Sequence, residues 1–204
     1  MQITDGVRSI LSSPAIYTLF QNLMGARSGW RKITDGYVQA KAGDIVLDIG
    51  CGPADVLDYL PQVQYWGFDI SPEYIDQAKR KYGSRGQFFC KFFERSDLEI
   101  LPKADIALLS GVLHHLDDGE AHGLLDLIGL ALKPGGRLVT VDPCLVPGQN
   151  PVARLLIERD RGRNVRDEAG YRDLVQGRFS SSRVQIVHKA WIPYTHCFTV
   201  NRNA

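Results

Sequence analysis

The sequence predicts an α/β fold in which a doubly wound, mostly parallel sheet carries helices on both faces. Short apolar runs that fit buried strands alternate along the chain with amphipathic segments that fit helices. The first such strand, residues 46–49, stops at Gly50 and Gly52 and is followed, after one short helix, by a second strand that ends in Asp69. A glycine loop lets a ligand approach the backbone closely, and a strand-terminal acid can accept hydrogen bonds from both ribose hydroxyls. We therefore expect a nucleoside-binding unit at the centre of the fold.

Cap and turn residues divide the rest of the chain into elements. Asp117 or Asp118 starts a long helix, Ser71 starts an earlier one, and Pro61 keeps the helix after the glycine loop short. The predicted helices span about residues 14–24, 30–40, 54–60, 72–82, 118–132, 152–159 and 168–176. The predicted strands span residues 46–49, 65–69, 87–92, 104–109, 137–141, 184–190 and 195–200.

The ends of the parallel strands are expected to build the ligand site. Right-handed crossovers bring the carboxyl ends of parallel strands to one edge of the sheet. Ligands of doubly wound folds bind at this edge, at the point where the strand order reverses. The residues that close or follow the strands should therefore converge there: Asp48, Asp69, Phe93, Ser110 and Asp142.

The charges around the glycine loop select the kind of nucleoside. A dinucleotide site needs glycine or alanine at the sixth position of G-x-G-x-x-G, where this chain has Asp55, and Asp48 adds a second carboxylate beside the loop. Two acids would repel a pyrophosphate but attract the sulfonium and ammonium groups of S-adenosylmethionine. The segment D-I-G-C-G at residues 48–52 resembles the D-x-G-x-G signature of class I S-adenosylmethionine-dependent methyltransferases, with Ala54 in place of the usual third glycine.

Three further segments extend the resemblance over roughly residues 45–142. Residues 104–116 are similar to the family's fourth strand with its L-H-H ending, although an aromatic residue is more usual at Ala104. Residues 97–102 resemble the acid-apolar step and L-P pair after the third strand, and residues 133–138 resemble the L-K-P-G-G turn before the fifth. The resemblance implies a seven-stranded Rossmann-like sheet completed by an antiparallel pair. The length of 204 residues fits a single domain over residues 1–204, made of a helical cover (1–42), a cofactor-binding core (43–142), a helical substrate insertion (143–183) and a hairpin (184–204).

The resemblance also implies which residues hold the cofactor S-adenosylmethionine. The glycine loop would line its methionine end, with Asp48 accepting from its ammonium group, and Asp69 would hold the ribose. Asp97 with Leu98 fits the acid usually found near the adenine amino group, although residues 93–94 are nearer the strand end. The alternative role for these acids is turn capping. The full set of cofactor residues expected in this way is Asp48, Gly50, Cys51, Gly52, Asp69, Ile70, Asp97, Leu98, Ser110 and, on the first helix, Tyr17.

Two adjacent histidines are the candidates for a catalytic base. Methyl transfer from a sulfonium is an in-line displacement, so the protein chiefly aligns donor and acceptor and excludes water. Where the acceptor must lose a proton, His114 or His115 near the tip of the fourth strand can take it, because imidazole titrates near neutral pH. The alternative for either histidine is a place in the core or at the start of a helix.

The acceptor site is expected from residues 143–183, which the core does not use. This insertion carries eight arginines against five acids. Its positive charge predicts a small anionic acceptor, such as a carboxylate, a phosphate or a sugar nucleotide. Arg161 and Arg163 are the candidate substrate ligands, since Gly162 between them permits a turn that aims both side chains inward. The alternative is a solvated, salt-bridged surface.

Bulk properties narrow the functional class and the compartment. A formal net charge of +1 over 204 residues gives no field that would draw the chain to nucleic acid. Four cysteines without C-x-x-C or metal-ligand spacing fit a reducing cytoplasm, and no apolar segment fits a signal peptide or a membrane span. A methyltransferase acting on a small molecule is the leading prediction. The alternatives are a non-catalytic partner subunit of the same fold, a nucleic-acid methyltransferase and, least favoured, a dehydrogenase.

Overall fold

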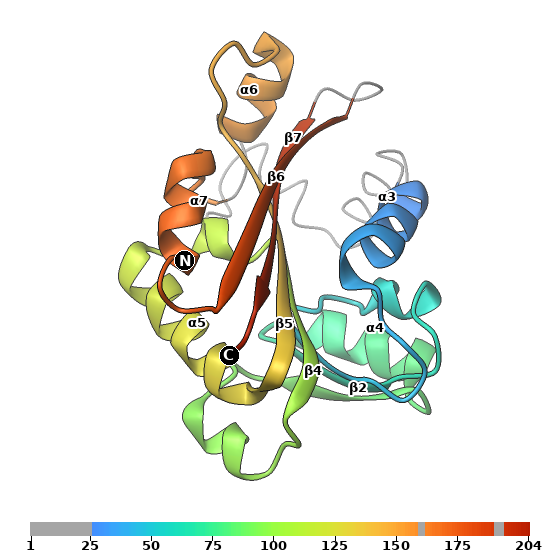
Figure 1. Ribbon diagram of the computed structural model, residues 1–204. Coiled ribbons are helices and arrows are strands. Elements are labelled where there is room, and N and C mark those ends of the chain that lie inside the picture. The colour runs from blue at the N-terminus through green and yellow to red at the C-terminus, as the bar shows by residue number, and fades with distance from the viewer. Residues whose placement is uncertain (1–25, 159–161, 190–193) are drawn as a thin grey trace.

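The computed structural model describes residues 26–158, 162–189 and 194–204 (Figure 1). The expected helix at residues 14–24, with Tyr17, lies outside these ranges, as does Arg161. The described residues form a seven-stranded sheet with helices on both faces. The predicted fold class is thereby confirmed.

The sheet is mostly parallel and reverses its order at its centre. Its strands are β1 (Ile45–Ile49), β2 (Gln64–Asp69), β3 (Gly86–Cys90), β4 (Ala104–Ser110), β5 (Leu132–Pro143), β6 (Ser181–Lys189) and β7 (Tyr194–Arg202). They lie in the order β3-β2-β1-β4-β5-β7-β6. The strands from β3 to β5 are parallel, whereas β7 is antiparallel to both of its neighbours, as the resemblance implied. Because the chain leaves β1 toward β2 on one side and later returns to β4 on the other, the ligand-binding switch point lies above β1 and β4.

Two apolar clusters, one on each face of the sheet, hold the helical layers in place. The helical segments are α3 (Ala26–Ile33), η1 (Thr34–Val38), η2 (Asp55–Asp58), α4 (Pro72–Tyr82), η3 (Arg95–Glu99), η4 (Leu113–His115), α5 (Asp118–Ala131), α6 (Pro151–Glu158) and α7 (Glu168–Val175). On one face η1, η2 and α4 pack through Val38, Leu57 and Ile75. On the other face α5 and α7 pack through Leu125 and Leu174. In Figure 1, α6 stands beyond the carboxyl ends of the parallel strands, next to β7.

Two predicted helix starts are confirmed by their capping hydrogen bonds. Ser71 Oγ accepts from Tyr74 N at 3.4 Å ahead of α4. Asp117, rather than Asp118, caps α5, because its Oδ1 accepts from Glu120 N at 2.9 Å while Asp117 N donates to Glu120 Oε2 at 3.0 Å. This reciprocal box satisfies two backbone N–H groups that the helix start would otherwise leave open.

Two predicted helices have a different form in the structure. The helix expected at residues 30–40 begins earlier, at Ala26, and widens after Ile33 into a π turn that Gln39 closes with a φ of +50°. The helix expected from Ala54 is a single 3-10 turn, because Ala54 takes a left-handed conformation and Pro61 follows soon after the turn. Both differences arise from backbone conformations that periodicity does not report.

The K-P-G-G segment, predicted as a tight turn before the fifth strand, lies within β5 as an irregularity. The pairing of β4 with β5 shifts so that Asp105 faces the stretch 133–136. Gly135 supplies a positive φ of +73°, and Lys133 Nζ donates to both carboxylate oxygens of Asp105 at 2.8 Å. The extra residues are therefore absorbed without separating the two strands.

We predict that Asp117→Ala lowers the free energy of unfolding by about 1 kcal/mol, because it removes the cap of α5. Urea denaturation followed by circular dichroism measures this loss. Asp76→Ala, which replaces an exposed acid in the middle of α4, is the control and should change stability by less than about 0.5 kcal/mol. Equal losses in the two variants would show that the capping box contributes nothing of its own.

Candidate functional site

The residues expected at the carboxyl edge come together around the glycine loop, with one exception. Asp48 lies in β1, Asp69 closes β2 beside it, and Ser110 closes β4 on the other side. Asp69 Oδ2 accepts a hydrogen bond from Gly52 N at 2.9 Å, which ties this acid to the loop. Phe93 is the exception, because its ring is buried in the core rather than turned toward the edge.

The two loop glycines are required for different reasons. Gly50 and Gly52 both have positive φ, +72° and +54°. A Cβ on Gly50 would lie 2.5 Å from Val112 Cγ2, so the loop is tightly packed at that point. Within the described part of the chain, nothing lies within 4 Å of a Cβ placed on Gly52, so this backbone faces open space that a ligand can enter. Burial raises the pKa of the Cys51 thiol between them, which therefore stays protonated.

Ala54, which stands where the signature usually has a third glycine, adopts the backbone conformation that glycine would favour. Its φ is +59°, and the residue is fully buried. A left-handed backbone conformation at alanine is unfavourable by about 1 kcal/mol, and the packing around the residue must hold it in place. Gly50 and Gly52 keep their left-handed conformations next to it. The departure from the signature therefore leaves the loop open.

Asp48 is a buried acid, and among the described residues one of its two carboxylate oxygens accepts no hydrogen bond. Asp48 is only 2% exposed, and its Oδ2 accepts a hydrogen bond from Tyr65 Oη at 2.5 Å. Among the described residues, no hydrogen bond reaches Oδ1. Burial is the largest effect and raises the pKa of Asp48 to about 7. The hydrogen bond from Tyr65 lowers this pKa, whereas the negative charge of Asp69 raises it. A cationic ligand group beside Oδ1 would stabilise the ionised form.

Asp69 and Ile70 form an acid next to an exposed apolar side chain. The two carboxylate oxygens of Asp69 accept from Gly52 N at 2.9 Å and from Ser71 N at 2.8 Å, which fixes the orientation of the group. Each oxygen retains a further lone pair for a ligand donor. Ile70 is 54% exposed, an unusual position for a large aliphatic residue. An acid for hydroxyls beside an apolar surface for a flat base fits a nucleoside.

Asp97 caps a turn in this structure. It is 1% exposed, its Oδ2 accepts from Glu94 N at 2.9 Å, and Lys91 Nζ lies 2.7 Å from its Oδ1. Glu94 caps the same turn reciprocally, so both carboxylates have partners within η3 and its flank. Leu98 is half buried against the core cluster. Asp97 therefore caps this turn, and a contact with adenine stays a prediction.

The structure pairs His114 with Asp142. His114 follows β4 in the short turn η4, is 5% exposed, and places its Nδ1 2.8 Å from Asp142 Oδ1 near the end of β5. The backbone N–H of His114 donates to the same oxygen at 3.2 Å. A carboxylate oxygen accepts, so this contact assigns a proton to Nδ1. His115 packs its ring on that of His114, with the centroids 4.0 Å apart.

The role of Asp142 was missed from the sequence, although its place at a strand end was predicted. The available signal was an acid near the end of one strand, β5, next to a second strand, β4, that is followed by a histidine. That signal depends on strand order, because β4 and β5 must be adjacent for Asp142 to reach His114.

Four of the six described arginines of the insertion are engaged in ion pairs. Within the described residues, the pairs are Arg154–Glu158 at 2.8 Å, Arg166–Asp118 at 2.7 Å, Arg172–Glu168 at 2.7 Å and Arg178–Asp126 at 2.8 Å. The salt-bridged alternative is thus confirmed for these four. Arg163, a candidate substrate ligand, is exposed. Gly162 before it lies directly on the ring of His114, so close that a Cβ there would overlap the imidazole.

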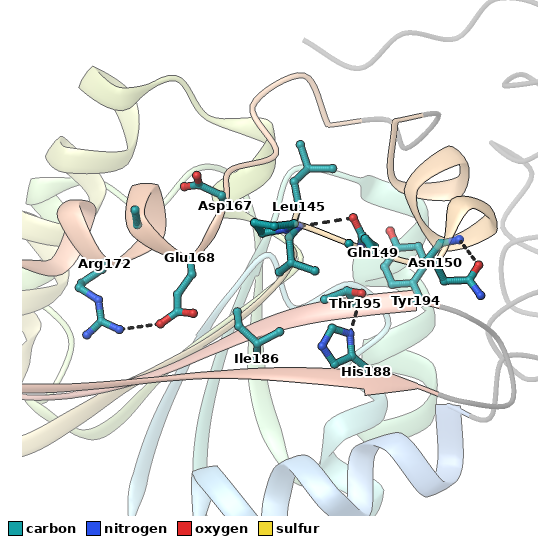
Figure 2. Close-up of a pocket in the computed structure, with 15 residues that line it drawn as sticks. Leu145, Gln149, Asn150, Asp167, Glu168, Arg172, Ile186, His188, Tyr194 and Thr195 are labelled. Carbon is teal, nitrogen blue, oxygen red and sulfur yellow. Dashed lines mark hydrogen bonds and ion pairs between the residues drawn. The ribbon is translucent and has the colours of Figure 1, made fainter.

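A separate cavity of about 880 Å³ opens at the far edge of the sheet (Figure 2). It is lined by the loop 145–150, the first turn of α7 and the outer ends of β6 and β7. Glu168 paired with Arg172, and His188 bonded through Nδ1 to Thr195 Oγ1 at 3.2 Å, face it from two sides. Neither the glycine loop nor the acids of β1 and β2 line this cavity, so its size does not mark the nucleoside site.

The chain is similar to methyltransferases in sequence and in fold. Residues 47–138 match the methyltransferase domain family. Demethylmenaquinone methyltransferase of Lactobacillus johnsonii is 30% identical over 155 residues, which cover 68% of this chain and 60% of that protein. 27-O-Demethylrifamycin SV methyltransferase of Amycolatopsis mediterranei is 32% identical over 126 residues, 57% of this chain and 46% of that protein. The structure of the pyocyanin biosynthetic protein PhzM superposes with a TM-score of 0.72 at 20% identity, over 99% of this chain and 63% of that one.

The fold is that of a Rossmann-like methyltransferase domain with an antiparallel terminal hairpin. The sequence matches are to methyltransferases, over residues 47–138 for the family and over 155 residues for the Lactobacillus protein. The chain spans less than two thirds of the length of the relatives named above, at 60%, 46% and 63%. None of the helices in the described part of the chain has the length and apolar character that a membrane crossing requires.

The raised pKa of Asp48 predicts a pH-dependent stability. Between pH 4 and its folded pKa of about 7, the unfolded chain ionises Asp48 while the folded protein keeps it protonated, so stability falls as pH rises through this window. The whole effect is at most about 4 kcal/mol, since each pKa unit corresponds to about 1.4 kcal/mol. Asp48→Asn removes this part of the pH dependence, whereas Asp76→Asn on the surface retains it. Urea denaturation from pH 4.5 to 8 is the measurement, and identical slopes for wild type and Asp48→Asn would contradict the assignment.

Proposed function

We propose that this protein transfers the methyl group of S-adenosylmethionine to an oxygen or nitrogen of a small, anionic molecule. The observation that carries the proposal is the site around the glycine loop. It combines a buried acid with an unfilled oxygen, Asp48, a backbone open to a ligand at Gly52, and an oriented strand-terminal acid, Asp69. Cationic and hydroxyl groups fit these two acids, and a pyrophosphate does not.

The proposed cofactor contacts follow from this arrangement. Asp48 Oδ1 would accept from the ammonium group, Asp69 would accept from the ribose hydroxyls, and Ile70 would cover one face of the adenine. When bound, the cofactor supplies a methyl group that is already electrophilic, so the chain has to align it and keep water out. The remaining residues that we assign to the cofactor are Gly50, Cys51, Gly52, Asp97, Leu98, Ser110 and Tyr17.

We assign the proton transfer to His114, with Asp142 holding its ring. Nδ1 is occupied by the carboxylate at 2.8 Å, so Nε2 is the nitrogen that would take a proton from an acceptor hydroxyl or amine. Asp142 would stabilise the imidazolium that forms, because the pair is buried and opposite in charge. His115, half buried on the outer side of the stack, is the alternative base.

The acceptor is proposed to bind beside His114, next to the segment of the insertion that covers it. The support is that Gly162 lies on the ring of His114 and is followed by the exposed Arg163, with Arg161 next to it in the sequence. An arginine beside the base would orient a carboxylate or phosphate group of the acceptor. The two relatives named above are named for methylation of demethylmenaquinone and of 27-O-demethylrifamycin SV, which agrees with a small-molecule acceptor. The four cysteines, all described and unpaired, agree with a reducing cytoplasm.

Calorimetry with S-adenosylhomocysteine tests the proposal directly. Asp69→Ala should weaken binding by roughly 1.5 to 3 kcal/mol, the range for losing hydrogen bonds to a charged group. Asp76→Ala on the surface of α4 is the matched control and should bind as the wild type does. No binding by the wild type at millimolar ligand would favour the non-catalytic subunit, and tight binding of a nicotinamide dinucleotide would restore the dehydrogenase.

Activity measured against a panel of carboxylate and sugar-nucleotide acceptors, by formation of S-adenosylhomocysteine, tests the assigned base. With an acceptor found in this way, His114→Gln should lower kcat by roughly 100-fold or more, the range for losing a general base. Its affinity for S-adenosylhomocysteine should not change, because the ring lies outside the proposed cofactor contacts. His115→Gln is the matched variant, and a larger loss in that variant would transfer the role to His115.

A further inference from the structure

One arginine of the insertion makes contacts unlike those of the others. The guanidinium of Arg166 donates through Nη1 to Leu113 O and through Nη2 to Leu116 O, both at 2.9 Å. Nη1 also donates to Asn164 O at 3.1 Å, and Nη2 lies 2.7 Å from Asp118 Oδ1. Its side chain is 10% exposed. The other paired arginines of the insertion have larger exposed fractions, so Arg166 is the most deeply placed of the four.

These contacts hold the turn that carries the proposed base. Leu113 and Leu116 flank His114 and His115, so Arg166 takes up the carbonyl oxygens at both ends of η4. Asp142 holds the same turn from the other side, through the backbone N–H and the Nδ1 of His114. The turn therefore lies between an anion that binds its donors and a cation that binds its acceptors.

The contacts also connect the turn to the insertion. Asn164 N donates to His114 O at 3.0 Å, and Leu145 N, just after β5, donates to Arg166 O at 3.1 Å. The guanidinium carbon lies 6.0 Å from the ring centre of Tyr171, whose hydroxyl donates to Pro143 O at 2.9 Å. Arg166 thus stands where the end of β5, the segment over His114 and the first buried residue of α7 meet.

We propose that Arg166 is a positioning residue that keeps the imidazole of His114 on Asp142 and the segment 162–164 over it. The proposal rests on the proposed function, in which His114 is the base. The hydrogen bonds to the two carbonyls hold the turn more strongly than the ion pair with Asp118 does. The Asp118 side chain is 78% exposed, and ion pairs at exposed sites are weak. A guanidinium can reach both carbonyls because its donors form a rigid fork, whereas a lysine ammonium is a single point.

Exchange of the Nδ1 proton of His114, followed by nuclear magnetic resonance of histidine-labelled protein, tests this role without an acceptor or a cofactor. The spectrum of His114→Gln identifies the signal. In Arg166→Lys the proton should exchange about tenfold faster, because the turn opens more often. Arg178→Lys is the matched control, since Arg178 also joins the insertion to α5 by an ion pair, with Asp126, and to one carbonyl, Leu174 O. It should exchange at the wild-type rate.

The outcomes separate this inference from the proposed function. Wild-type exchange in Arg166→Lys, with calorimetry still showing S-adenosylhomocysteine binding, would overturn the positioning role and leave the methyltransferase proposal standing. Faster exchange in Arg166→Lys but not in Arg178→Lys, with the affinity for S-adenosylhomocysteine unchanged, supports the positioning role. Asp118→Asn leaves Arg166 in place and is the milder variant to use where Arg166→Lys does not fold. It should accelerate exchange by no more than about twofold, because it removes the weaker contact and leaves both carbonyl bonds. A tenfold acceleration there would assign the rigidity of the turn to the ion pair and contradict the role of the carbonyl bonds.

Discussion

The burial of a carboxylate in the middle of the sheet is the constraint on which the proposed site depends. Asp48 lies in β1, the central strand of the nucleoside unit, and an ionised acid there would be costly without partners. The structure lowers this cost in two ways, by a hydrogen bond from Tyr65 and by a pKa of about 7 that keeps much of the group protonated. The remaining oxygen favours a cation, which is why the loop suits a sulfonium amino acid better than a diphosphate.

The insertion contributes more to the order of the site than to its charge. Counting arginines in the sequence suggests a positive surface for an anion, but four of them neutralise acids on α5, α6 and α7. What the insertion adds near the base is coverage, because Gly162 lies on His114 and Asn164 bonds to its carbonyl. Removal of water from a base and its carboxylate strengthens their interaction. The 5% exposure of His114, the proposed base, therefore fits a site that keeps water away from the acceptor.

Strand order separates the proposed nucleoside site from the 880 Å³ cavity. The acids of the nucleoside site come from β1 and β2, whereas the 880 Å³ cavity lies over β6 and β7 at the opposite edge. Volume alone would place the chemistry in the second region. The buried acid with an unfilled oxygen and the histidine paired with a carboxylate both lie in the first. Those features, rather than size, identify where a charged cofactor would be recognised.

The antiparallel hairpin was implied by the resemblance to the methyltransferase family. The sequence by itself determined the parallel core, the glycine loop, the cap at Ser71 and the start of α5 at Asp117 or Asp118. Each of these depends on local chemistry or on a period of two or 3.6 residues, which can be read without knowing any contact. Only the tertiary structure decided that Asp142 holds His114, because these residues are 28 positions apart and meet only when β4 and β5 are neighbours. It also decided that Arg166 binds the turn while other arginines pair on the surface. A side chain's partner depends on which elements pack together, and that packing is set by the whole chain.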